Sequence, residues 1–220
     1  MKKIVKNNIS FKRAIVILAI VIVLVVLFIW STGIFSKNRD ATKFYNEYKS
    51  NTKIKEDNLY TYANKEKVLN ILDHETGVLY FGYSGSSWCK NMIEPLNSAA
   101  KDSKIKDIYY YDIKNDRDEL SINENGEIIT EKQGTAFYRE LLKILDNYLT
   151  PYVLTDEEGK EVNTEEKRIY VPLVVFVKEG KVVFAHQNTV KTQEEAKDKL
   201  SEKEKEDLIN IYKKGFNLIK

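Results

Sequence analysis

An uninterrupted apolar stretch bounded by glycines, residues 77–83 (GVLYFGY), constrains the fold of this chain more than any other feature. A continuous apolar run of this length is typical of a strand buried on both faces of an α/β sheet. A helix is predicted soon afterwards, over residues 90–100, and the only cysteine, Cys89, lies where the strand gives way to it. Because the positive end of a helix stabilises anions such as a thiolate, this junction is a candidate site for thiol chemistry.

The pattern beyond residue 58 alternates strands with helices, which indicates the α/β class. Strands are expected at 59–63 and 108–113, helices at 64–73, 135–149 and 201–219, and hairpins at 152–164 and 170–185. Residues 114–133 are charged and loop-like, with Asn125-Gly126 as a turn signal. Ser201 and Glu204 have the spacing of a capping box and predict where the last helix begins.

The strand-to-helix junction resembles the active-site motif of the thioredoxin fold family. Phe81 is followed five residues later by Ser86, and then by Ser87-Trp88-Cys89 and a lysine. Thioredoxins carry a phenylalanine, four residues, and then Cys-x-x-Cys-Lys, with Met-Ile-x-Pro shortly after. Here the same tetrapeptide pattern stands at 92–95, displaced by one residue.

A second segment is similar to the cis-proline strand of that family. Val171-Pro172 opens an apolar run, and Lys178 and Gly180 lie six and eight positions past the proline, as they do in thioredoxins. The resemblance implies a thioredoxin-like domain over residues 58–220, with a central mixed sheet flanked by helices. It also implies an insertion at about 114–168, before the cis-proline strand. Within the family, the chain is most similar to membrane-anchored, extracytoplasmic forms of low-GC bacteria, including the bacteriocin-transport-accessory type.

Two registers of the active-site motif are open. In one, Cys89 is the first cysteine and Met92 replaces the second. In the other, Ser86 replaces the first cysteine and Cys89 is the second. The spacing from Phe81, the Cys-Lys pair and the later Pro95 favour the second register. A third interpretation is that Cys89 is only a small buried apolar residue, as free cysteines usually are.

In the favoured register, the position of the nucleophile holds Ser86. A serine hydroxyl is not ionised near neutral pH and does not exchange with disulfides, so a Ser-x-x-Cys site cannot cycle between dithiol and disulfide. The family carries a buried aspartate where this chain has Tyr80, and Gly-Pro where it has Ser87-Trp88. By resemblance, the catalytic positions are Cys89 and Ser86, and the substrate-binding residues are Ser87, Trp88, Val171 and Pro172.

The N-terminal region predicts a membrane anchor. Residues 14–30 are uninterrupted apolar and no charge follows before residue 37, which approaches the ~20 residues that span a bilayer. A cleaved signal peptide is the alternative, but no small-x-small site follows Trp30. Five basic residues precede the run and, by the positive-inside rule, place the N-terminus in the cytoplasm. The expected order is a cytoplasmic tail (1–13), a transmembrane anchor (14–35), a spacer (36–57) and an extracytoplasmic domain, giving a single-pass protein of the cell membrane.

Other chemistries find little support in the sequence. The net charge is +2, but the five basic residues ahead of the apolar run carry +5, so the rest of the chain carries −3. A mildly acidic main domain argues against nucleic acid as a partner. Two histidines and one cysteine without close spacing predict no metal site, and no glycine-rich phosphate loop is present, so no cofactor is expected. Residues 82–86 resemble a hydrolase nucleophile elbow but end in serine instead of glycine.

Two functions from different classes follow. The first is an enzyme of the thiol–disulfide oxidoreductase lineage, in which Cys89 works as a single thiol and dithiol cycling is impaired or lost. The second is a non-enzymatic adaptor that holds an extended peptide, or a secreted protein, in the groove beside Trp88 and Pro172. Pairing of an extended peptide with exposed backbone groups is a known mode of recognition.

Overall fold

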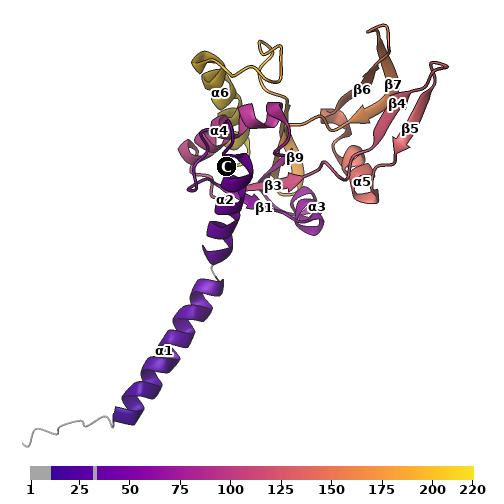
Figure 1. The fold of residues 1–220 in the computed structure, drawn as a ribbon. Helices are drawn as coiled ribbons and strands as arrows, with labels where there is room; N and C mark the ends of the chain where they lie inside the picture. Colours follow the sequence, from indigo (N-terminus) through magenta and orange to yellow (C-terminus); the bar gives the residue numbers. More distant parts are fainter. Residues whose placement is uncertain (1–10, 32–33) are drawn as a thin grey trace, which may run out of the picture. The chain divides into compact units, whose positions relative to one another are not determined.

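Figure 1 shows the computed structural model of the chain, which describes residues 11–31 and 34–220. The chain divides into two compact units, Met1–Asp40 and Ala41–Lys220. The first unit contains α1 (Phe11–Ser31) and the beginning of α2 (Ile34–Tyr48). Residues 1–10 of the expected cytoplasmic tail lie outside the described residues.

The prediction of a transmembrane anchor at residues 14–35 is wrong on this structure. Among the residues described, no helix has both the length and the apolar character that crossing a membrane requires. The expected fold class is corrected in this respect, as is the expected location in the cell membrane with a cytoplasmic N-terminus and an extracytoplasmic domain.

The second unit is built on a five-stranded mixed sheet with the order β1-β3-β2-β8-β9. Its strands are β1 (Tyr60–Tyr62), β2 (Gly77–Gly82), β3 (Ile108–Asp112), β8 (Leu173–Lys178) and β9 (Lys181–Gln187). The first three run parallel, whereas β8 is antiparallel to β2 and β9 to β8. β2 and β8 are almost entirely buried, as the continuous apolar runs in the sequence predict.

Helices cover both faces of this sheet: α3 (Lys65–Asp73), α4 (Ser87–Asp102), α5 (Ala136–Ile144) and α6 (Glu202–Leu218). α4 and α6 pack against each other, and Phe216 of α6 contacts Phe176 of β8 with ring centroids 5.1 Å apart. On the opposite face, Phe137 of α5 contacts Tyr111 of β3 at 5.1 Å. The capping box predicted at Ser201 is present, since its side chain and that of Glu204 each bond the other's backbone.

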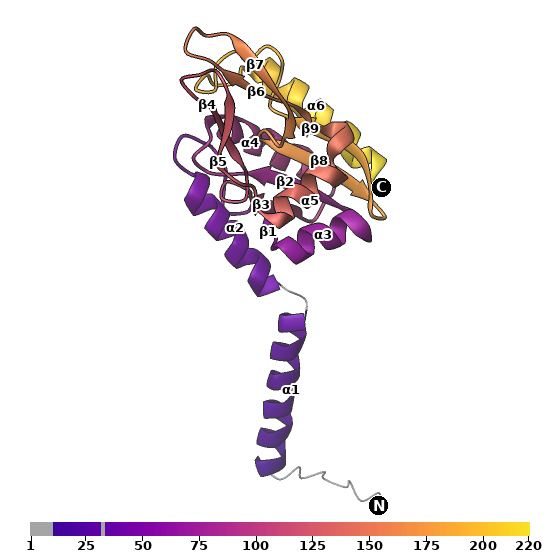
Figure 2. The same cartoon turned by 90° about the vertical axis from the view of Figure 1, so that its right-hand side faces the viewer.

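The segment between β3 and β8 holds two hairpins that lie side by side in both views (Figures 1 and 2). The hairpin of β6 (Thr150–Thr155) and β7 (Glu161–Arg168) is confirmed, and a short 3₁₀ helix, η1 (Asp146–Tyr148), precedes it. The hairpin of β4 (Glu119–Ile122) and β5 (Ile128–Lys132) replaces part of the expected loop. Its tip contains Gly126 at a φ of +79°, a left-handed conformation that glycine adopts without strain.

The second unit begins at Ala41, inside the stretch expected as a solvated spacer. Phe44 and Tyr48 of α2 are fully buried, and Phe44 stacks on Tyr60 with ring centroids 3.9 Å apart. The side-chain amide of Asn58 donates to the carbonyl of Ala41 at 2.8 Å and joins this helix to the start of β1. The end of α2 is therefore part of the hydrophobic core.

Candidate functional site

The junction between β2 and α4 is organised by Ser86. The helix begins at Ser87, earlier than the sequence predicts, and Ser86 is its N-cap. The Ser86 Oγ accepts a hydrogen bond from the backbone N–H of Cys89 at 3.3 Å. The Ser86 N–H donates to the carbonyl of Tyr83 at 3.1 Å, which closes the turn after β2. Serine is favoured at an N-cap because its hydroxyl satisfies an N–H that the helix leaves unpaired. Ser86 therefore caps the helix at the position where a nucleophile would stand.

Cys89 lies one turn into α4 as a free and fully buried thiol. Burial raises the pKa of Cys89, and it outweighs the opposing effects of hydrogen bonds with Ser86 and Tyr80 and of the positive charge of Arg117. The thiolate is the reactive form of cysteine, so this thiol is both inaccessible and protonated near neutral pH.

Buried tyrosines from five different elements surround Cys89: Tyr48 of α2, Tyr60 of β1, Tyr80 of β2, Tyr110 of β3 and Tyr212 of α6. Burial raises the pKa of each phenol, and the neighbouring Cys89 raises it further. The Tyr48 Oη lies 3.4 Å from that of Tyr80 and donates to that of Tyr110 at 3.3 Å. Three of these tyrosines thus form a hydrogen-bonded cluster inside the core, whereas the hydroxyl of Tyr60 donates to the carbonyl of Ile93 and that of Tyr212 has no partner among the described residues.

This cluster was not foreseen from the sequence. The run 109–111 predicts a buried strand with the hydroxyls at its margins, yet the hydroxyl of Tyr110 is an interior one. The available signal was the strand register, because Tyr110 pairs with both Tyr62 and Tyr80 and therefore shares their face of the sheet. The pairing of these strands cannot be read from the sequence and is known only from the structure.

The other expected binding residues lie at the same end of the sheet. The Val171–Pro172 peptide bond is cis, as expected. Leu173, which follows it, pairs with Phe81 near the end of β2, so Pro172 lies beside the turn that leads to Ser86. Within the described residues, no hydrogen bond joins the backbone N–H or carbonyl of Val171 to another group, although the residue is only 8% exposed.

Ser87 and Trp88 form the outward side of the junction. Ser87 is exposed and Trp88 is partly exposed, whereas Ser86 and Cys89 on either side of them are buried. The two middle residues of the segment 86–89 therefore face solvent, and the two outer ones face the interior. A surface for a partner is available here, but a sulfur atom is not part of it.

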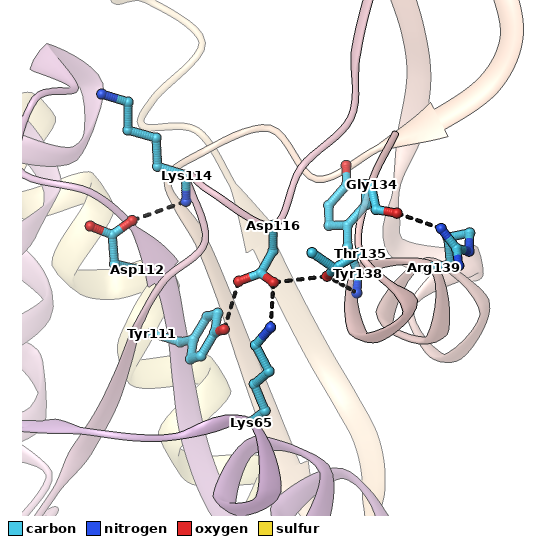
Figure 3. A network of polar contacts seen from close by, with 9 residues as sticks. All are labelled: Lys65, Tyr111, Asp112, Lys114, Asp116, Gly134, Thr135, Tyr138 and Arg139. Atoms are coloured by element: carbon cyan, nitrogen blue, oxygen red, sulfur yellow. Dashed lines mark hydrogen bonds and ion pairs between the residues drawn. The ribbon is translucent and has the colours of Figure 1, made fainter. Parts of the chain in front are cut away.

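The loop after β3 contributes side chains that sequence reasoning missed. Asp116 accepts hydrogen bonds from Lys65 (2.6 Å), Tyr111 (2.7 Å) and Thr135 (2.8 Å), as Figure 3 shows. Burial acts to raise the pKa of Asp116, but these three donors outweigh it and hold the pKa below its ordinary value. Asp116 therefore ties the inserted segment to α3 and to the central sheet.

Arg117, the next residue, faces the junction. Its guanidinium carbon lies 5.3 Å from the centroid of the Tyr83 ring, within cation–π range. Its charge acts on Cys89 by favouring the thiolate, although less strongly than burial disfavours it. The loop thus supplies a positive charge that acts on the thiol of Cys89.

No group of three or more metal-ligating side chains occurs among the residues that the structure describes. Comparison of the chain with models of protein families, with curated proteins and with solved structures finds no match. Function must therefore be inferred from the geometry of the junction.

Proposed function

We propose that this chain is a thioredoxin-like module that binds an extended peptide segment of a partner protein without dithiol–disulfide exchange. Support for the relationship comes from the cis bond before Pro172, from the sheet order and from the motif around Cys89. Support for the loss of exchange comes from Ser86, whose hydroxyl is engaged as a helix cap, and from the burial of the only thiol.

Val171 carries the proposal. Its backbone N–H and carbonyl have no partner among the described residues and are therefore open to a hydrogen-bonding partner. An extended peptide supplies one acceptor and one donor at the spacing of a strand, and so satisfies both groups at once. Trp88, partly exposed on the neighbouring turn, offers apolar area to a side chain of that peptide.

A binding assay on the full-length protein tests this. The probe is an unfolded chain without cysteine or tryptophan, such as a variant of α-lactalbumin that lacks both and is kept unfolded, which excludes capture through a mixed disulfide. A Trp30→Phe background leaves Trp88 as the only tryptophan and hence as the fluorescent reporter. Saturable binding is expected, with a change in Trp88 emission.

Two proline variants give the matched comparison. Pro172→Ala should weaken binding at least about tenfold, because it changes the backbone beside Val171. Pro151→Ala, at an exposed position of β6, should leave binding unchanged. Equal binding by all three proteins would contradict the proposal.

The same assay separates the second candidate function, single-thiol chemistry. That function is favoured by one observation, the hydrogen bonds and the charge of Arg117 that stabilise the thiolate of Cys89. A probe that contains cysteine should then be captured covalently by the protein and not by Cys89→Ser. Binding that is unaffected by Cys89→Ser supports the peptide-binding module.

A further inference from the structure

The inserted segment contains a pocket that is separate from the Cys89 junction. It has a volume of about 400 Å³ and lies between β4, β5, β7 and α5. Leu120, Tyr138 and Leu142 form its apolar part. The volume falls within the range of small-molecule sites, which are mostly apolar with a few placed polar groups.

Asp118 is the polar group that marks this pocket as a site. The residue lines the pocket but is only 8% exposed, and its Oδ1 is buried without a hydrogen-bond partner. This oxygen therefore has no cation or other donor among the described residues, and the nearby Arg168 donates to the backbone carbonyl of Asp118 instead. A buried carboxylate oxygen without a donor is costly, so the pocket gains from a ligand that brings one.

Positive charge lines another part of the same pocket. Arg139 and Lys143 lie four residues apart on α5, and therefore on one face of the helix. The Arg139 Nη1 donates to the carbonyl of Gly134, another lining residue, which fixes the position of the guanidinium (Figure 3). A guanidinium with an ammonium beside it is a common receptor for a carboxylate. Glu166 of β7 adds a second carboxylate to the lining.

We propose that this pocket binds a small zwitterion of amino-acid or dipeptide size. Its ammonium group pairs with Asp118, and its carboxylate pairs with Arg139 and Lys143. Short side chains lie against Leu120 and Leu142. The proposal does not depend on Cys89 or Pro172, because none of the lining residues belongs to the junction.

The first test varies the ligand. Alanyl-alanine is titrated into the full-length ¹⁵N-labelled protein, beside its N-acetylated and its C-amidated forms. The zwitterion should shift the signals of residues 118–143 and bind with a dissociation constant near or below about 1 mM. Loss of either charge should weaken binding at least about tenfold. Absence of binding at about 10 mM, or equal binding of the N-acetylated form, overturns the proposal.

The second test varies the protein. Asp118→Asn should weaken binding of the dipeptide about as much as N-acetylation of the dipeptide does. It should not further weaken binding of the N-acetylated form, because the substitution and the acetylation remove the same ion pair. The combined Arg139→Gln and Lys143→Gln variant should behave in the same way toward the C-amidated form. Glu140→Gln, on the same helix but outside the pocket, is the matched control. If thermal unfolding shows that Asp118→Asn is folded and the variant still binds the dipeptide normally, the proposal is overturned. If Asp118→Asn does not fold, the ligand series decides it.

Discussion

The phenol of Tyr80 and the thiol of Cys89 are neighbours inside the core of the domain, and each shifts the pKa of the other. Ser86 contributes a second hydroxyl to the same thiol, so the sulfur has hydroxyl neighbours where a redox pair would have a second sulfur. Both hydroxyls favour the thiolate, yet burial outweighs them. The arrangement therefore stabilises a neutral thiol and integrates it into the tyrosine cluster.

Replacing Tyr80 by phenylalanine should raise the pKa of Cys89 further, because the substitution removes one of the hydrogen bonds that lower it. The rate of alkylation by iodoacetamide against pH measures this pKa in the folded protein. The wild-type value should lie above the ordinary ~8.5, and the variant value above that. Tyr109→Phe, on the opposite face of β3, is the control and should change nothing. A wild-type pKa below about 7 would mean an exposed, reactive thiol.

The same shift makes stability depend on alkaline pH. Because the folded pKa of Cys89 is raised, its stabilising effect is complete below the unfolded value of about 8.5 and is lost as the pH rises through the folded pKa. The free energy of unfolding in urea should therefore begin to fall above about pH 8.5. In Cys89→Ala the fall should begin only near pH 10, where the tyrosines of the unfolded chain titrate. Identical pH profiles for the two proteins would contradict this.

Ser86→Cys should create the dithiol that the motif lacks. The Oγ of Ser86 already accepts from the backbone of Cys89, so side chains at positions 86 and 89 lie on the same side of the first turn. After oxidation, mass spectrometry should show the loss of two hydrogens, and with dithiothreitol as the reductant the protein should catalyse insulin reduction, which the wild type should not. Ser87→Cys is the matched control, because Ser87 is exposed and points away from Cys89. Catalysis by the wild type would refute the assignment of Ser86 as an inactive position.

The elements of the central sheet could be predicted because each carries a strong local signal. β2 and β8 are continuous apolar runs, and Ser201 with Glu204 marks the start of α6 by its side-chain chemistry. The cis bond before Pro172 was expected from the resemblance of this segment to the cis-proline strand of thioredoxins. The two strands and the start of α6 each depend on a few adjacent residues, so contacts with distant segments do not alter them.

What could not be predicted depends on contacts between distant segments. β4 and β5 are short and contain no buried residue, so no periodicity distinguishes them from a loop. Asp116 is an ordinary acidic loop residue until the fold brings Lys65 and Thr135 to it. The end of α2 was assigned to a spacer because two buried rings in a polar stretch do not establish a core-facing helix.

Phe44→Ala tests that last correction. Phe44 is fully buried and stacks on both Tyr48 and Tyr60, with ring centroids 4.4 and 3.9 Å apart. Removing a buried phenylalanine typically costs about 3–5 kcal/mol, and chemical denaturation should show a loss of that size. Thr42→Ala, exposed on the same helix, should cost less than about 0.5 kcal/mol. Equal stability of the two variants would mean that α2 is not part of the cooperative unit.

Asp116→Asn should destabilise the protein in a pH-dependent way. The carboxylate accepts from Lys65, Tyr111 and Thr135, and hydrogen bonds to a charged group are worth about 1–3 kcal/mol each, so a loss of at least that size is expected at pH 7. The folded pKa of Asp116 is lowered, so its contribution is present above the unfolded value of about 3.9 and is lost as the pH falls through the folded pKa.

The difference in unfolding free energy between the two proteins should therefore narrow below about pH 4. Asp112→Asn is the control, because Asp112 is exposed and, among the described residues, accepts only from the backbone N–H of Lys114. Urea denaturation at a series of pH values measures all three proteins. A difference that is constant from neutral to acidic pH would show that Asp116 stabilises the insertion through its shape and hydrogen-bonding capacity, without a contribution from its charge.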